Sequence, residues 1–149
     1  MDLINENLII PESELTDKEE IIKMMANIMK ENDRLTDLDV YVRKVLEREN
    51  MGATAVGYGV GIPHGKTDAV KKPTLAFTKT KELVKWGDEK EDWVNLIFMI
   101  AVPESAASDE HLKILATLSR KLMNDDFRNS LLSTDDRVEL NNILQGVFA

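Results

Sequence analysis

The sequence contains no cysteine and only two histidines among its 149 residues. Without cysteine the chain has no disulfide, no thiolate metal ligand and no cysteine nucleophile. No run of apolar residues approaches the roughly 20 that a membrane-spanning helix needs. Residues 1–6 also lack the cationic start and apolar centre of a signal peptide. We therefore expect a cytoplasmic protein with no segment inserted in a membrane.

Basic residues are scarce as well, with 19 lysines and arginines against 27 acidic residues and a net charge of −8. Such a surface is poorly suited to nucleic acid or anionic lipid, whereas it suits a basic protein partner. A charge of this size equally serves to keep a protein in solution. The chain has no internal repeat and no proline- or glycine-rich linker, so we expect one domain over residues 1–149.

The hydrophobic pattern alternates between helix and strand periods. Residues 94–102 are almost all apolar and stop at Pro103, which predicts a central strand covered on both faces. Residues 8–10, closed by Pro11, and residues 74–78 are predicted to be further strands. Helices are predicted after Thr16, after Thr36, and over residues 109–123, 126–132 and 137–146. This order predicts an α/β domain with helices packed around a sheet.

Local patterns add detail to this outline. A capping box of Thr16 and Glu19 predicts the start of the first helix, and the segment 86–92 is predicted to be a solvated turn. Ser108 is expected to cap the helix that follows the central strand. The buried faces of three helices are predicted to consist of Ile21, Met24, Met25, Ile28 and Met29; of Leu38, Tyr41, Val42, Val45 and Leu46; and of Leu112, Leu115, Leu118 and Leu122.

Four of the seven glycines fall within nine residues around one histidine, in the segment Gly57–Gly65. Glycine offers a core no side chain, but it is useful where the backbone turns sharply or approaches a ligand. Backbone N–H groups in such a loop can face an anion. His64 is the reactive side chain that the segment presents. A glycine-rich turn with an incidental histidine is the alternative, and the glycine density favours a functional loop.

The second histidine, His111, lies in the first turn of the helix after the central strand, beside Asp109 and Glu110. Ligands of open α/β sheets bind at the carboxyl ends of strands, near helix N-termini. His111 therefore stands where a site residue is expected. Because Leu115 follows one turn later, His111 is equally compatible with a histidine at the edge of the core.

Two imidazoles suit phosphoryl transfer, in which one acts as the nucleophile and the other donates a hydrogen bond to the phosphoryl oxygens. A metal site formed by His64, His111 and a carboxylate such as Glu104 is an alternative, although no recognised ligand spacing supports it. The glycine segment also lacks the G-x-x-x-x-G-K-[ST] pattern of a P-loop.

The segment from Arg48 to Gly65, RENMGATAVGYGVGIPHG, resembles the phosphorylation-site signature of type-2 enzyme IIA. These are the fructose/mannitol class domains of the bacterial phosphoenolpyruvate-dependent sugar phosphotransferase system. The resemblance continues through residues 66–73, 101–104 and 110–116 and covers essentially the whole chain. Tyr58 and Gly61 depart from the common pattern, which often has asparagine and alanine there.

The resemblance implies a mixed β-sheet flanked by helices on both faces. It implies that His64 is the phosphorylated histidine, that His111 stabilises the phosphoryl group, and that Arg48 and Thr54 have supporting roles. No metal or other cofactor is implied. The donor would be the histidine-containing phosphocarrier protein, and the acceptor would be enzyme IIB, which works with the membrane enzyme IIC to import a sugar, most closely of the fructose type.

Three alternatives to a transport enzyme IIA are a regulatory paralogue phosphorylated in the same way, a small metal-dependent hydrolase, and an interaction module that accepts no phosphoryl group. The start at Met1 and the short end after Gly146 favour a free-standing subunit.

Overall fold

The computed structural model describes residues 3–105 and 108–148, the latter without the side chains of 108–111. The helices are α1 (Lys18–Glu31), α2 (Leu38–Asn50), α3 (Ser108–Leu122), α4 (Asp125–Leu132) and α5 (Arg137–Val147), with 3₁₀ turns η1 (Glu6–Leu8) and η2 (Lys90–Asp92). The strands are β1 (Ile9–Ser13), β2 (Ala55–Gly57), β3 (Val60–Gly61), β4 (His64–Thr67), β5 (Thr74–Lys85) and β6 (Trp93–Pro103).

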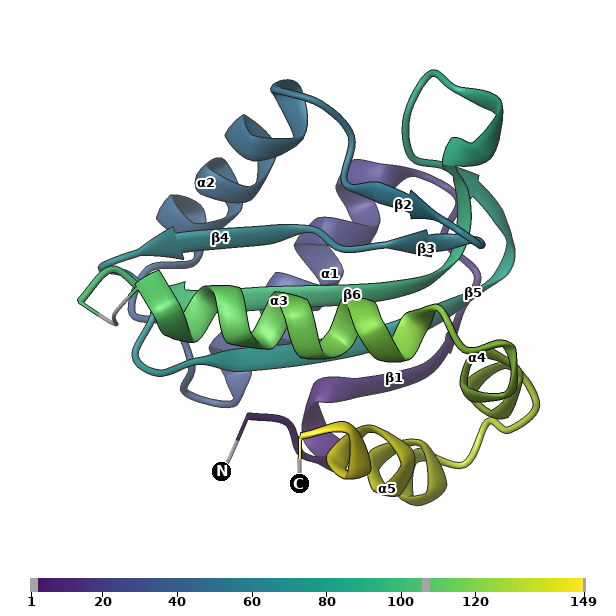
Figure 1. The fold of residues 1–149 in the computed structure, drawn as a ribbon. Coiled ribbons are helices and arrows are strands. Elements are labelled where there is room, and N and C mark those ends of the chain that lie inside the picture. The colour runs from purple at the N-terminus through teal and green to yellow at the C-terminus, as the bar shows by residue number, and fades with distance from the viewer. Residues whose placement is uncertain (1–2, 106–107, 149) are drawn as a thin grey trace.

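The strands form one six-stranded mixed sheet in the order β1-β5-β6-β3-β2, with β4 also paired to β6. β5 and β6 are antiparallel, β1 runs parallel to β5, and β3 and β4 run parallel to β6. Strands β3 and β4 follow one another along the same edge of β6 (Figure 1). The predicted fold class, a single α/β domain with a mixed sheet, is confirmed.

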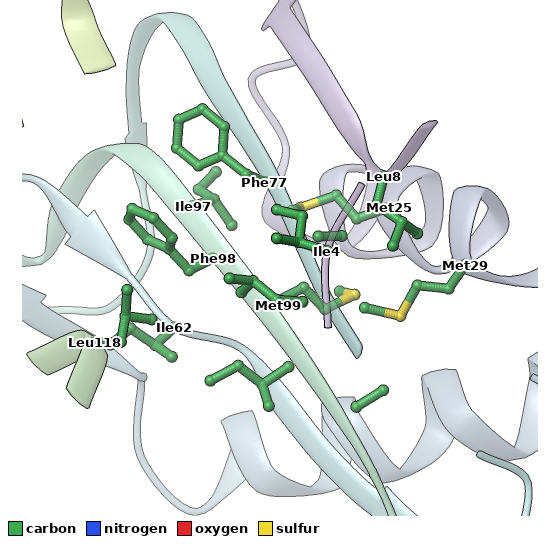
Figure 2. Close-up of a cluster of buried hydrophobic side chains, with 14 of the residues drawn as sticks. Ile4, Leu8, Met25, Met29, Ile62, Phe77, Ile97, Phe98, Met99 and Leu118 are labelled. Atoms are coloured by element: carbon green, nitrogen blue, oxygen red, sulfur yellow. The ribbon is translucent and has the colours of Figure 1, made fainter. Parts of the chain in front are cut away.

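Helices cover both faces of the sheet. α1 and α2 pack on one face, and α3, α4 and α5 lie together on the other (Figure 1). The side chains of β6 alternate between the two layers: Met99 faces Met25 and Met29 of α1, whereas Phe98 gathers with Leu118 of α3 (Figure 2). From Leu96 to Val102 every residue of β6 is buried, as predicted for a central strand.

The predicted apolar faces of the first two helices are also confirmed. Met25 and Met29 of α1 are fully buried, as are Tyr41 and Val45 of α2. Burial raises the pKa of the Tyr41 hydroxyl far above its usual range, and this hydroxyl donates a hydrogen bond of 2.8 Å to the carbonyl oxygen of Ile100.

Several local predictions were wrong at the element ends. The cap of α1 is Asp17 instead of Thr16, because the Asp17 carboxylate accepts a hydrogen bond from the backbone N–H of Glu20. The first strand begins at Ile9 and continues through Pro11 to Ser13. Proline is tolerated there because β1 is an edge strand, paired only with β5.

Two apolar side chains are placed differently from the prediction. Trp86, expected in a solvated turn, is 2% exposed because its indole packs inward against Gly61. Leu112, expected in the buried seam of α3, is 62% exposed. Its place in the seam is taken by Ile114, which is buried with Leu118 and Leu122. The Ser108 cap predicted for α3 lies outside the described side chains.

No helix within residues 3–105 and 108–148 is both long enough and apolar enough to cross a bilayer.

Candidate functional site

His64 is the first residue of β4, and it pairs with Ile100 near the carboxyl end of β6. A Cβ added to the next residue, Gly65, would meet Tyr41 and Val45 of α2 at 3.2 Å, so Gly65 faces the α2 layer. Successive residues of a strand face opposite sides of the sheet. His64 therefore faces the α3 layer, and its half-buried side chain remains partly accessible.

A hydrogen bond fixes the ring of His64. Its Nδ1 atom lies 2.9 Å from the carbonyl oxygen of Ile62. A carbonyl oxygen only accepts, so Nδ1 carries the proton and donates it. In the neutral ring Nε2 then carries the lone pair, which is the nucleophilic form of imidazole.

The first turn of α3 lies at the same end of the sheet as His64. β6 ends at Pro103, and α3 begins at Ser108 and returns across the sheet (Figure 1). The backbone of His111 belongs to this first turn. The side chains of Asp109, Glu110 and His111 lie outside the described residues, so the predicted pairing of the two histidines stays a prediction.

The four glycines of the segment Gly57–Gly65 serve two different structural purposes, which the sequence alone did not distinguish. Gly57, Tyr58 and Gly59 all have positive φ, at 88°, 57° and 76°, and form the tight turn between β2 and β3. The neighbouring Val60 pairs with Leu96, four residues before Ile100, the partner of His64. The turn therefore lies about 13 Å from His64 along the sheet. The prediction that a glycine-rich loop presents His64 was wrong in this respect, because His64 lies on strand β4.

The other two glycines allow close packing. A Cβ on Gly61 would meet the Trp86 ring at 3.3 Å, and Gly65 admits α2 close to β4. His64 thus lies on β4 between Gly61 and Gly65 in the sequence, and at both glycines the backbone packs directly against large side chains. Its support is the sheet and not a flexible loop.

A buried polar cluster lies at the start of β2. Thr54 is 6% exposed and Glu49 is 7% exposed. The Thr54 backbone N–H donates to the Glu49 carboxylate at 3.1 Å, and the Thr54 hydroxyl donates to its other oxygen. Trp86 Nε1–H donates to Thr54 Oγ1 at 3.3 Å, and Lys18 Nζ lies 2.6 Å from Glu49 Oε1. Thr54, predicted as a supporting residue, is therefore the centre of a connected network.

Arg48 lies in the last turn of α2, and its Nη1 atom donates a hydrogen bond of 2.9 Å to the carbonyl oxygen of Gly52. This contact ties the end of the helix to the connection that leads to Thr54. Glu49, Lys18 and Trp86 were not predicted from the sequence as residues of the site. A signal for Glu49 was present, because it continues the four-residue spacing of the buried Tyr41 and Val45.

The basic residues after His64 are dispersed. Lys66 of β4 is half-buried, and Lys71 is paired with Asp33 at 2.5 Å, where the ammonium group lowers the pKa of the Asp33 carboxyl. Within the part of the chain whose side chains are described, no group of three or more histidine and acidic residues is arranged to hold a metal ion.

An apolar hollow of about 250 Å³ lies between the β2–β3 turn and the C-terminal half of α3. Its rim includes three exposed apolar side chains, namely Val56, Tyr58 and Met123. The Arg128 guanidinium lies 4.3 Å from the centroid of the Tyr58 ring. The hollow lies on the same face of the sheet as His64.

These features define an α/β protein that presents a nucleophilic imidazole on one face of its sheet, supported by a buried polar network. The family model described as "Phosphoenolpyruvate-dependent sugar phosphotransferase system, EIIA 2" matches residues 2–147. The chain belongs to this family. It is therefore a phosphotransferase component of the sugar phosphotransferase system with a phosphoryl carrier role.

Two curated relatives are similar in sequence: one matches this chain over most of its own length, and the other is much longer than this chain. The fructose-specific EIIA component of Haloferax volcanii is 39% identical over 130 residues, covering 87% of this chain and 84% of that protein. The fructose-specific EIIABC component of Bacillus subtilis is 33% identical over 134 residues, and the alignment covers 90% of this chain but 21% of that protein. This chain matches only a part of that longer protein, so the longer protein's full activity is not assigned to it.

The fold is shared with the nitrogen regulatory protein IIA-Ntr of Neisseria meningitidis, a crystal structure with a TM-score of 0.86 and 31% sequence identity, covering 96% of this chain and 97% of that one. The relatives thus include proteins named as fructose-specific components of the phosphotransferase system and a protein named for nitrogen regulation.

Proposed function

We propose that His64 receives a phosphoryl group on Nε2 from the histidine-containing phosphocarrier protein and passes it to enzyme IIB for sugar uptake. The observation that carries this proposal is the hydrogen bond from His64 Nδ1 to the carbonyl oxygen of Ile62. It selects the tautomer in which Nε2 holds the lone pair.

The transfer is an exchange between two imidazoles. The Nε2 lone pair of His64 forms the new P–N bond while the P–N bond to the donor histidine breaks, and that electron pair stays on the donor nitrogen. The His64 ring gains positive charge as the bond forms. The Ile62 carbonyl oxygen faces Nδ1–H and stabilises this charge. The step needs no metal and no nucleotide, since catalysis consists of positioning and charge stabilisation.

His111 is proposed to donate a hydrogen bond to the phosphoryl oxygens from the first turn of α3. The N-terminal end of a helix favours negative charge, which adds to this stabilisation. Arg48 and Thr54 are proposed to support the segment that carries His64, since both act on the connection between α2 and β2.

The proposed partners follow from the surface and from the family. The net charge of −8 favours a basic docking face, as expected for the phosphocarrier protein. The apolar hollow beside the β2–β3 turn gives both partner proteins an apolar surface on the face that His64 occupies. Fructose is the proposed sugar class because the Haloferax relative is named as fructose-specific.

The test is transfer of labelled phosphate from phosphoenolpyruvate through enzyme I and the phosphocarrier protein. The wild-type chain should accept one acid-labile, base-stable phosphoryl group. His64→Ala should accept none, whereas His111→Ala should fold and accept label more slowly. Labelling of His64→Ala at the wild-type rate would exclude His64 as the carrier.

The regulatory alternative has specific support in the similarity to the Neisseria nitrogen regulatory protein. Both roles share the first transfer and differ in the second. Phosphorylated chain mixed with a fructose-type enzyme IIB should lose its label to IIB. Retention of the label in the presence of active IIB would favour a regulatory role.

A further inference from the structure

We propose that Glu49 and Thr54 form a positioning unit that sets the ring of His64 through the backbone of Ile62. The inference rests on the proposed role of His64; it adds Glu49 and gives the supporting role of Thr54 a route through the backbone. Neither side chain has a described contact with His64, so both act through the chain segment between them.

The connection consists of three successive steps, made by four hydrogen bonds. The Thr54 backbone N–H and hydroxyl both bind the Glu49 carboxylate. The Thr54 carbonyl oxygen accepts a hydrogen bond of 2.8 Å from the backbone N–H of Ile62. The Ile62 carbonyl oxygen then accepts from His64 Nδ1 at 2.9 Å. Each bond therefore fixes the group that makes the next.

A second contact reaches the same segment from the side. The Thr54 hydroxyl donates to Glu49 and accepts from Trp86 Nε1–H, so its hydrogen-bonding capacity is used on both sides. The Trp86 ring in turn lies against the backbone of Gly61, the residue before Ile62. The segment 61–62 is thus held by a hydrogen bond and by a packed ring.

Lys18 supplies the positive charge that pairs with the Glu49 carboxylate of this unit. Its Nζ lies 2.6 Å from Glu49 Oε1, donates to the Trp86 carbonyl oxygen at 2.7 Å, and lies 5.1 Å from the centroid of the Trp86 ring. A buried carboxylate is retained only where a cation and donors satisfy it. Lys18 is the first residue of α1, so the unit joins α1, α2 and the sheet behind the site.

This arrangement explains why a hydroxyl residue stands at position 54. An aliphatic side chain of the same shape would remove the hydroxyl donor to one Glu49 carboxylate oxygen and leave the Trp86 N–H without its buried acceptor. The segment between β3 and β4 that presents the Ile62 carbonyl oxygen would lose part of its lateral support, and this acceptor would shift relative to His64 Nδ1.

The test compares Thr54→Val with Thr54→Ser. Thr54→Val should lower the second-order rate of phosphoryl transfer to His64 by about tenfold or more, since small displacements of a reacting group are costly. In long-range ¹H–¹⁵N spectra of the His64 ring, the fraction of the Nδ1–H tautomer should fall. Thr54→Ser retains the hydroxyl and should restore both the rate and the tautomer signal. Glu49→Gln should act in the same direction as Thr54→Val.

Lys79→Met provides a control for simple loss of stability. Lys79 is buried in a separate polar cluster, where it donates to the carbonyl oxygens of Leu131, Leu132 and Thr134 at the end of α4. This variant should be destabilised yet keep the wild-type tautomer signal and transfer rate per folded molecule.

The two proposals fail in different ways. If wild-type chain is labelled on His64 but Thr54→Val keeps the rate and tautomer, the positioning unit is wrong and the carrier role stands. If Thr54→Ser fails to restore the signal, or Lys79→Met also shifts it, the effect is one of stability and the positioning role is likewise wrong. Labelling of His64→Ala would overturn the carrier role itself.

Discussion

Gly57 and Gly59 show how two neighbouring glycines can be needed for different reasons. Both have positive φ, which an L-residue with a side chain adopts at a cost of about 1 kcal/mol. A Cβ on Gly57 would meet nothing within 4 Å, whereas a Cβ on Gly59 would lie 2.8 Å from the Asn95 side-chain oxygen. The same substitution at the two positions therefore separates backbone strain from steric overlap.

We expect Gly57→Ala to lower the free energy of unfolding by about 1 kcal/mol, the cost of the backbone conformation alone. Gly59→Ala should cost a further 1–3 kcal/mol or so, because the Asn95 side chain must move. Urea denaturation of both variants measures the difference. Equal losses would mean that Asn95 reorients freely and that glycine is required at position 59 for its φ angle alone.

The residues of the site differ in how far the sequence could reveal them. His64 was identifiable because the chain has only two histidines, and this one lies in a segment unusually rich in glycine. The network around Thr54 was not, because Lys18, Glu49 and Trp86 are far apart in sequence and meet only through the fold. Only the periodicity of α2 pointed to a buried residue at position 49.

At the scale of elements, the strongly periodic segments were predictable and the segments that depend on tertiary contacts were not. β6 and the buried faces of α1 and α2 follow directly from runs and spacings of apolar residues. Trp86 was placed wrongly because its charged neighbours suggest a surface turn, whereas its ring covers Gly61. Leu112 was placed wrongly because the buried seam of α3 includes Ile114 in place of Leu112.

The packing of α2 on β4 depends on Gly65. A Cβ at this position would come within 3.2 Å of Tyr41 and Val45, both fully buried. We expect Gly65→Ala to lower the free energy of unfolding by about 1–3 kcal/mol, as an overpacked core does. Thermal or urea unfolding measures the change.

Gly146 supplies the matched substitution. It lies in α5, and a Cβ there would meet nothing within 4 Å. Gly146→Ala should therefore raise the free energy of unfolding by about 0.5–1 kcal/mol, because alanine favours the helix and restricts the unfolded chain. A destabilised Gly146→Ala, or a neutral Gly65→Ala, would contradict the packing that these two positions indicate.

At the scale of the whole molecule, the acidic surface and the position of the proposed site together predict how the rate of association with a partner protein depends on charge. In the proposed function the chain meets two partner proteins on the face of the sheet that His64 occupies, so its net charge acts on the rate of encounter more than on the fold. Asp126 lies exposed in the first turn of α4, close in sequence to Met123 on the rim of the apolar hollow. Glu31 is exposed at the end of α1, in the layer on the opposite face of the sheet.

We expect the second-order rate of phosphoryl transfer from the phosphocarrier protein to fall by about tenfold as ionic strength rises from roughly 10 mM to 200 mM. The first-order rate within the bound complex should change little, because screening acts mainly between separated charges. Asp126→Asn should reduce the salt dependence, whereas Glu31→Gln, with the same change of charge, should leave it unaltered. Rapid-quench measurements at several phosphocarrier concentrations separate the two rates. Equal effects of the two variants would mean that net charge, and not its placement on the α3 face, governs the encounter.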